Sequence, residues 1–447
     1  MRHAALAPLV LLASLSGGAH AQTNEELRQK LDQALKTIQD LQGRVNALEQ
    51  HKAATAAAAA AAPGTWGAPV VSTGARAEDG APEANKARVE FYGQAMVDAI
   101  YDAKRMNPDY AATLRPSQIP VNCPGDAGCG EDGAATFSVR QSSLGFRAFI
   151  PTGIGVLKTD LSFDLFASDG STNIHWLSAW AELGMFGIGQ TYSNFMDIDV
   201  FPNTIDYWGP SGMVFVRNPQ LRVTPWAKDG MALALSLEAP NSALDTGKIS
   251  EISPDFGAGF TGWNRLPDLT ASWRLDRDWG HVKAAGILRQ VGYQNTLTTD
   301  GTPSGHKTGY GLNLAGAFKV FGKDQINLQL VVGEGIASYM NDGGVDLAPG
   351  PGLRAETVPT LGWLAYYNHA WSDKWTSTIG FSQHEQNNTD GQTGTAFKRG
   401  SYGNANLLYT PAKNVLTGLE FVWGELEQKS GESATDYRLQ FSTKVTF

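Results

Sequence analysis

Polar and apolar side chains alternate along most of the chain between Arg88 and Phe447. In segment 436–447 the apolar face holds Tyr437, Leu439, Phe441, Val445 and Phe447, and the polar face holds Arg438, Gln440, Ser442, Lys444 and Thr446. Because successive side chains of a strand point to opposite sides, this pattern predicts a strand with one apolar and one polar face. A strand of roughly 9 to 11 residues crosses a bilayer when it is tilted.

We mark sixteen candidate strands between Arg88 and Phe447, and the connections between them are unequal in length. Short turns are expected at 151–154, 184–185, 225–230, 276–280, 320–324, 372–373 and 411–414. Longer connections are expected at 103–135, 191–214, 240–267, 293–307, 334–358, 385–400 and 427–435. Short turns on one side and long loops on the other are typical of outer-membrane barrels. The pattern predicts an all-β chain that folds as a 16-stranded antiparallel transmembrane β-barrel (88–447), with its last strand beside its first strand, Arg88 to Asp102.

The amino-terminal segment 1–21 has the features of a cleavable secretory signal peptide. Arg2 and His3 precede an apolar run from Ala4 to Leu15, and small residues lead to the triplet Ala19-His20-Ala21. No later stretch approaches the roughly 18 apolar residues that a transmembrane helix needs. An exported chain that enters a membrane without helices requires a closed barrel, because only closure satisfies every backbone group in lipid.

Segment 22–51 is predicted to be an α-helical coiled coil, because its apolar residues recur at four-three spacing. The seam consists of Leu27, Leu31, Ala34, Ile38, Leu41, Val45 and Leu48. This pattern predicts self-association, although an amphipathic helix packed on its own domain is the alternative. So few heptads leave the number of helices open. Segment 52–87 is rich in Ala, then in Gly, Pro and charge, and is expected to be a linker.

Composition narrows the remaining classes of function. The 447 residues include 50 glycines and two cysteines, and the net charge of −9 argues against nucleic acid as a partner. Cys123 and Cys129 are expected to close a small disulfide loop, since no histidine or second cysteine pair lies near enough for zinc. The acidic residues around them are interpreted as a solvated loop, with calcium as the alternative. We predict no metal site and no cofactor.

The side-chain parity of the strands predicts a lumen with many cations. The predicted pore-lining basic residues on this ground are Arg147, Lys158, Arg222, Arg274, Lys283, Arg289, Arg438 and Lys444, facing Asp160, Asp164, Glu238, Asp268 and Glu420. Arg140 has the opposite parity and needs a bulge to join them. Such a basic ladder favours small anions. Ordinary polar lining with weak selectivity is the alternative.

Segment 191–214 differs from the other long connections because it is rich in large apolar residues. An exposed loop of this kind would form a sticky patch, so we expect it to fold inward against the barrel wall as a constriction loop. The residues assigned to this constriction are Tyr192, Phe195, Asp197, Asp199, Asp206, Tyr207 and Trp208.

Three segments of this region resemble the DcaP-like porins of Gram-negative outer membranes. They are Gly-Gln-Thr-Tyr-Ser-Asn-Phe-Met-Asp at 189–197, Phe-Pro-Asn-Thr-Ile-Asp-Tyr-Trp-Gly-Pro-Ser-Gly at 201–212 and Arg-Asn-Pro-Gln-Leu-Arg at 217–222. The resemblance implies a homotrimer of sixteen-stranded barrels in the bacterial outer membrane, with the coiled coil in the periplasm. It also implies passage of small anionic solutes such as dicarboxylates, roles for Arg217 and Arg222, and recognition of the last strand by the barrel-insertion machinery.

Two other functions compete with this expectation. The coiled coil suggests a structural protein that tethers the envelope, with a weakly selective pore. A barrel-borne hydrolase would need a nucleophile, a base and an orienting group together, and the histidines are scattered without a nucleophile motif. We therefore predict no enzymatic activity and no catalytic residues.

Overall fold

The computed structural model describes residues 36, 86–125, 128–167 and 170–447. The expected signal peptide (1–21), coiled coil (22–51) and linker (52–87) lie outside these residues, apart from Lys36, Lys86 and Ala87. The coiled-coil seam from Leu27 to Leu48 therefore stays a prediction. No helix in the described part of the chain is long and apolar enough to cross a membrane.

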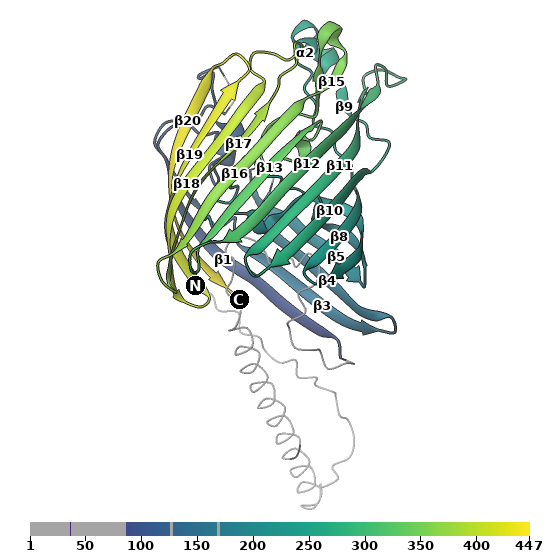
Figure 1. The fold of residues 1–447 in the computed structure, drawn as a ribbon. Helices are drawn as coiled ribbons and strands as arrows, with labels where there is room; N and C mark the ends of the chain where they lie inside the picture. Colours follow the sequence, from purple (N-terminus) through teal and green to yellow (C-terminus); the bar gives the residue numbers. More distant parts are fainter. Residues whose placement is uncertain (1–35, 37–85, 126–127, 168–169) are drawn as a thin grey trace, which may run out of the picture. The chain divides into compact units, whose positions relative to one another are not determined.

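Sixteen antiparallel strands close into a barrel (Figure 1). They are β1 (Arg88–Asp102), β3 (Ser143–Thr152), β4 (Gly155–Phe166), β5 (Thr172–Leu183), β6 (Phe186–Tyr192), β7 (Arg217–Lys228), β8 (Met231–Glu238), β10 (Asp268–Arg277), β11 (Gly280–Asn295), β12 (Gly305–Lys319), β13 (Gln325–Glu334), β16 (Pro359–Ala370), β17 (Trp375–Gln386), β18 (Phe397–Ala412), β19 (Val415–Gln428) and β20 (Ser433–Thr446). Strand β20 pairs with β1 from Gln94↔Thr446 to Asp102↔Arg438, which confirms the predicted closure of last strand on first.

Shorter elements extend the sheet and decorate the loops. Strands β2 (Ala134–Ser138) and β9 (Phe260–Gly262) pair with β1 and β11, and β14 (Leu347–Pro349) pairs with β15 (Ala355–Thr357). The helices are α2 (Lys248–Ile252) and α3 (Pro254–Ala258), and the single 3-10 turns are η2 (Pro108–Tyr110), η3 (Pro116–Gln118), η4 (Ile198–Val200), η5 (Ala337–Tyr339) and η6 (Pro351–Leu353).

The predicted division into turns and loops is confirmed. All seven predicted turns connect neighbouring strands at one end of the barrel, and the longer connections gather at the other end (Figure 1). We number the connections on the loop side 1 to 8 in chain order. Those used below are loop 1 (103–133), loop 3 (193–216), loop 4 (239–267), loop 6 (335–358), loop 7 (387–396) and loop 8 (429–432). The short loop between β4 and β5 was not among the predicted connections, and loop 8 is shorter than the predicted 427–435.

The alternation in β20 shows how the sequence directs the two faces of the wall. Leu439 and Phe441 are 46% and 50% exposed on the outside, whereas Arg438, Gln440 and Ser442 are fully buried on the inside. The outer face therefore has the apolar side chains that lipid requires. The inner face is polar, and buried groups there need partners inside the barrel.

The wall is interrupted between β2 and β3, which follow each other along the same edge of β1. This break turns the Arg140 side chain inward. It takes the place of the bulge that the parity of Arg140 required. Its guanidinium carbon lies 3.9 Å from the Phe166 ring centroid, and its Nη2 donates to the carbonyl oxygen of Ala167 at 2.9 Å. Gln141 follows it inward and donates to Asp98 at 3.1 Å.

Candidate functional site: the inward-folded loops and two arginines

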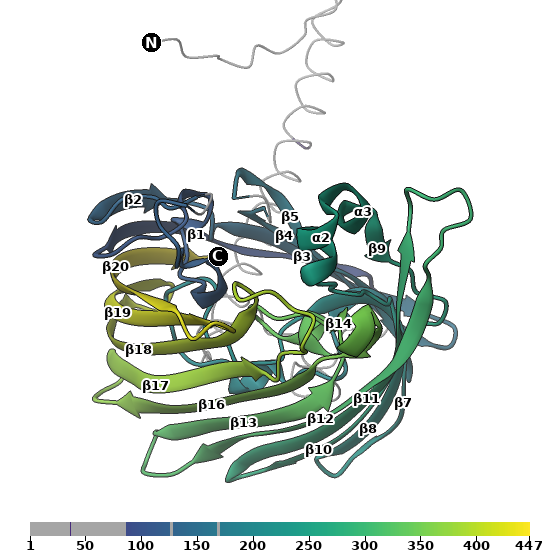
Figure 2. The same cartoon turned by 90° about the horizontal axis from the view of Figure 1, so that it is seen from above.

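Loop 3 packs inside the barrel against the inner faces of β11, β12, β13 and β16 (Figure 2). Its apolar residues Phe195, Met196 and Val200 are at most 2% exposed and form one cluster with wall residues such as Ile287 and Val331. Burying each such side chain stabilises the packing by about 1.5 to 3 kcal/mol. The wall therefore buries the apolar side chains of the loop.

Gly212 lets the loop backbone approach the wall closely. A Cβ at this position would lie 2.1 Å from the carbonyl oxygen of Gln383 and 2.5 Å from that of Trp363, so only glycine fits without a shift. A second glycine, Gly209, has a φ of +72° and donates its N–H to Asp206 at 3.3 Å. In the Gly-Pro-Ser-Gly segment of the loop, close packing therefore requires Gly212, and the left-handed backbone favours glycine at 209.

Two buried glutamates hold the ends of the packed segment. Glu238 accepts a hydrogen bond from the backbone N–H of Asn194 at 2.9 Å. Glu420, which is fully buried, accepts from the N–H groups of Ile205 and Asp206 at 3.2 and 3.0 Å and from the Thr204 hydroxyl. The Glu420 carboxylate also accepts from the side-chain amides of Asn404 and Asn406 at 3.1 and 2.7 Å. Five donors therefore satisfy a buried carboxylate that has no ion-pair partner in the described residues.

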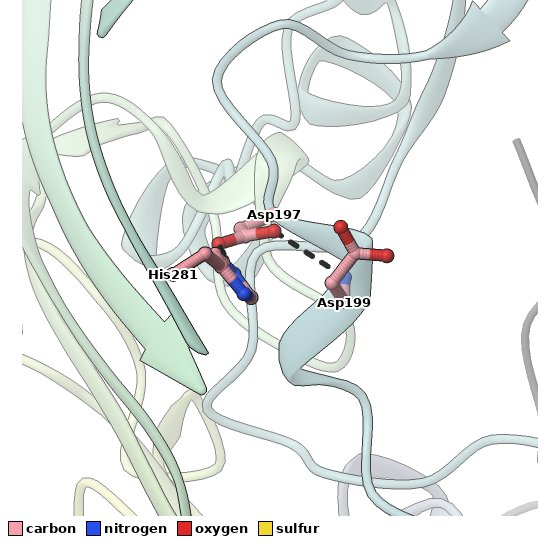
Figure 3. Close-up of side chains that lie close together, drawn as sticks. All are labelled: Asp197, Asp199 and His281. Atoms are coloured by element: carbon pink, nitrogen blue, oxygen red, sulfur yellow. Dashed lines mark hydrogen bonds and ion pairs between the residues drawn. The ribbon is translucent and has the colours of Figure 1, made fainter. Parts of the chain in front are cut away.

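A third anchor joins Asp197 and Asp199 to β10 and β11. Figure 3 shows the part of it that is formed by Asp197, Asp199 and His281. His281 Nε2 lies 2.8 Å from Asp197, and Arg274 Nη1 lies 3.3 Å from Asp197 and 2.6 Å from Asp199. Lys283 Nζ donates to the carbonyl oxygen of Met196 at 2.6 Å. These contacts pin the start of η4 to the wall.

The Asp197, Asp199 and His281 ligand atoms lie within 4.8 Å of one another, which is close enough to hold a metal ion. Both carboxylates already contact Arg274, which supplies the positive charge there. We therefore interpret the cluster as an anchor for loop 3.

The anchor depends on the ionised form of Asp197. Burial opposes ionisation, but the hydrogen bond with His281 and the charges of His281, Arg274 and Lys283 together hold the pKa of Asp197 well below its usual range. A carboxyl group whose pKa is depressed by folding contributes stability above its unfolded pKa of about 3.9, and that stability is lost as the pH falls through the folded pKa.

We expect loop 3 to stay anchored here between pH 8 and pH 5, and to loosen only below about pH 4. In Arg274→Gln the pKa of Asp197 rises, so the loosening begins at a higher pH. Single-channel conductance and current noise recorded across this pH range measure the effect, with the exposed Arg277→Gln as the control. An identical pH profile in Arg274→Gln and the wild type would contradict the assignment.

Loops 1 and 6 meet loop 3 inside the mouth of the barrel. Arg115 of loop 1 pairs with Asp342 of loop 6 at 3.0 Å, and its guanidinium carbon lies 3.9 Å from the Trp208 ring centroid of loop 3. The indole of Trp208 donates to the carbonyl oxygen of Asn341 at 2.8 Å, and the Asn341 amide returns a hydrogen bond of the same length. This junction was not predicted, because neither Arg115 nor Asp342 lies in a periodic segment or a motif of the sequence.

Tyr207 attaches loop 3 to strand β4 of the wall. Its ring stacks on Phe166 with centroids 3.8 Å apart, and its hydroxyl donates to Asp164 at 2.6 Å. Burial, and then the Asp164 charge, raise the pKa of Tyr207 well above its usual value, so this hydroxyl remains a donor. Asp206 accepts from Thr113, Leu114 and Tyr402 at 3.0 to 3.2 Å. Tyr192 is the last residue of β6 and belongs to the wall, and the other predicted constriction residues contact the wall or other loops.

Two predicted pore-lining cations are corrected by the structure. Arg289 and Arg438 have no exposed side-chain surface. Arg289 lies 3.2 Å from Asp268 and 3.4 Å from Asp346, and Arg438 lies 2.6 Å from Asp102 and 3.5 Å from Asp206. Their strands present them inward as predicted, but carboxylates brought by the loops and neighbouring strands enclose them.

Most of the other predicted cations also lie beside acceptors. Arg147 contacts Asp160 at 2.8 Å, and Lys158 contacts Glu182 at 3.6 Å near the turn side. Lys283 is buried and Arg274 is half-buried in the anchor described above. Lys444 is partly buried on the polar face of β20.

Arg217 and Arg222 on β7 form no ion pair within the described residues, and both flank Tyr192. Arg217 donates to the Tyr192 hydroxyl at 2.9 Å, and Arg222 donates to the Tyr192 carbonyl oxygen at 2.6 Å. Arg222 also donates to Gln220 at 2.8 Å, and Trp180 lies under its guanidinium at 5.5 Å. Both arginines are partly exposed. Two positive charges without carboxylate partners therefore lie on β7, the strand that follows loop 3.

Cys123 and Cys129 form a disulfide in loop 1, with Cα atoms 5.8 Å apart. The bond closes a small turn, as the spacing of the two cysteines led us to expect.

Comparisons with known proteins place this geometry among outer-membrane channels. The model of the family described as DcaP outer membrane protein matches residues 70–346. The outer membrane channel DcaP of Acinetobacter baumannii has a similar structure, with a TM-score of 0.67 and 21% identity over 82% of this chain and 99% of that one. The anion-selective porin from Comamonas acidovorans has a TM-score of 0.50 and 9% identity over 81% of this chain and 100% of that one. No curated protein sequence matches the chain.

Proposed function

The chain belongs to the DcaP outer membrane protein family, and we propose that it is a passive diffusion channel for small hydrophilic solutes with a preference for small anions such as dicarboxylates. Its fold is a closed barrel of the porin type. A barrel of this size encloses an aqueous channel, and its side chains and inward loops select what passes.

The observation that carries the anion preference is the pair Arg217 and Arg222 beside Tyr192. Their hydrogen-bond acceptors are neutral oxygens, and neither guanidinium forms an ion pair within the described residues. Unpaired guanidinium groups in a narrow, low-dielectric passage attract carboxylates and offer them two parallel hydrogen bonds. The Comamonas porin is described as anion-selective, but its likeness concerns the fold, so the proposal rests on the two arginines.

The assembly we propose is a homotrimer in outer-membrane lipid, with the coiled coil of segment 22–51 on the periplasmic side. The exposed apolar side chains of the outer wall are suited to contact lipid or neighbouring barrels. The heptad pattern from Leu27 to Leu48 supports self-association. We further propose that the signal peptide directs export and that the aromatic last strand is recognised by the barrel-insertion machinery.

Reversal potentials in a salt gradient across planar bilayers test the anion preference. We expect the wild-type channel to prefer chloride over potassium. In Arg217→Gln/Arg222→Gln the anion-to-cation permeability ratio should fall on the order of threefold to tenfold, because the positive potential beside Tyr192 is lost. Succinate uptake into liposomes should fall with it.

The matched control is Arg265→Gln/Arg277→Gln, which also removes two positive charges but leaves Arg217 and Arg222 in place. It should leave the permeability ratio unchanged. Cation preference in the wild type, or equal shifts in both double variants, would overturn the anion preference while leaving the channel itself intact.

A further inference from the structure

A cavity of 680 Å³ opens on the loop side, separate from the arginine pair. Its wall is formed by loop 1 and η3, the start of loop 4, loop 6 around η5, and the loop-side ends of β18 and β19. Ligand sites commonly have volumes of about 300 to 1,000 Å³. This loop-side cavity is therefore large enough for a solute of one or two rings.

The cavity carries no net charge from its described lining. Arg115 is its one ionisable lining residue, and the guanidinium is paired with the fully buried carboxylate of Asp342 at 3.0 Å. Trp208 covers the same guanidinium at 3.9 Å. A solute in the cavity thus meets neither a free cation nor a free carboxylate.

Uncharged hydrogen-bonding groups line the cavity instead. Gln118 donates one proton to Ser117 at 3.2 Å, and its carbonyl oxygen makes no hydrogen bond within the described residues. Gln428 accepts from Asn122 at 3.3 Å, and Asn107 accepts from the N–H of Asp109 at 3.1 Å. The side-chain amino groups of Gln428 and Asn107 have no partner in that same part of the chain.

Such amides offer both donors and acceptors, which is what a hydroxyl group requires because it is both at once. The cavity also has an apolar side, formed by Phe397, Ile119 and Leu426. Apolar and aromatic surfaces pack against the C–H faces of a sugar ring while amides bond its hydroxyls.

We propose that the loop-side cavity is a binding subsite for uncharged polyhydroxylated solutes of the size of a mono- or disaccharide. The cavity and the arginine pair are built from different residues, so the channel would select solutes at two separate places. This proposal goes beyond the anion preference. The binding of a solute does not depend on the proposed channel function, whereas the reduction of ion current by a bound solute rests on it.

Maltose is the probe for the test, used with the full chain. Calorimetry on the detergent-solubilised protein should show saturable maltose binding, and maltose added from the loop side should reduce ion current at the same concentrations. In Gln118→Leu/Gln428→Leu, which keeps side-chain volume and removes amide groups, the dissociation constant should rise at least tenfold. Gln294→Leu, outside the cavity, is the control and should bind as the wild type does.

The dependence of affinity on salt concentration distinguishes this site from an anion site. Because the cavity has no net charge, maltose affinity should be the same at low and high ionic strength, whereas ion binding is screened. Current reduction that merely follows solution viscosity, or equal maltose binding in the double variant and the wild type, would overturn the proposal. Conductance in salt without maltose reports the channel function independently, and it should be retained in every variant.

Discussion

Glu420→Ala should raise single-channel conductance and make the open current noisy. The change leaves the Thr204 hydroxyl, two backbone N–H groups of loop 3 and two wall amides without their shared acceptor. Each buried donor without a partner costs about 1 to 3 kcal/mol. The free energy that holds the loop against β18 and β19 should fall by several times the thermal energy, so the loop leaves the wall part of the time.

Planar-bilayer recordings measure this effect directly. Glu432→Ala removes an exposed carboxylate of loop 8 and is the matched control, with unchanged conductance expected. Glu420→Gln should be intermediate, since an amide keeps one acceptor and turns an amino group toward the donors. Wild-type conductance and noise in Glu420→Ala would show that the other anchors suffice and that this clamp does not hold the loop.

Arg438→Met should destabilise the whole barrel by about 3 to 5 kcal/mol, the usual cost of breaking a buried ion pair. Arg438 joins the closing strand β20 to Asp102 on β1 and to Asp206 on loop 3, and it donates to the carbonyl oxygen of Ala111 at 3.1 Å. Without it, the buried Asp102 has no ion-pair partner among the residues that the structure describes.

Urea titrations in lipid vesicles measure the free energy of unfolding. The double variant Arg438→Met/Asp102→Leu should recover part of the loss, because it removes the stranded carboxylate together with its partner. Arg277→Met, at the exposed end of β10, should cost little. If Arg438→Met unfolds like Arg277→Met, the seam does not depend on this ion pair.

The faces of the strands could be predicted from the sequence because alternation is local. Each residue of β20 needs only its neighbours along the chain to be placed inside or outside, and the exposures of Leu439 and Arg438 follow the prediction. The turns and long loops could be located for the same reason, since glycine, proline and polar clusters interrupt the alternation where the strands end. Inward parity did not imply contact with water, as Arg289 and Arg438 show.

The candidate site could be predicted only in part. The apolar residues of loop 3 indicated that it packs inward, and Arg217 and Arg222 came from a resemblance of motifs. The clamp by Glu420 and the pairing of Arg115 with Asp342 had no signal in the chain, because their partners are 214 to 216 and 227 residues away in sequence. No periodicity reports a contact of that range.

The sequence by itself determined a closed barrel, the identity of its inner and outer faces and the inward tendency of one loop, because a period of two residues and apolar composition act over short stretches. Only the tertiary structure decided which inner charges remain available. Loops 3 and 6 bring carboxylates to Arg115, Arg274, Arg289 and Arg438, and they leave Arg217 and Arg222 with neutral acceptors. Neutralisation of a buried charge depends on which distant groups the fold places within a few ångströms of it, and that distance exists only in the folded chain.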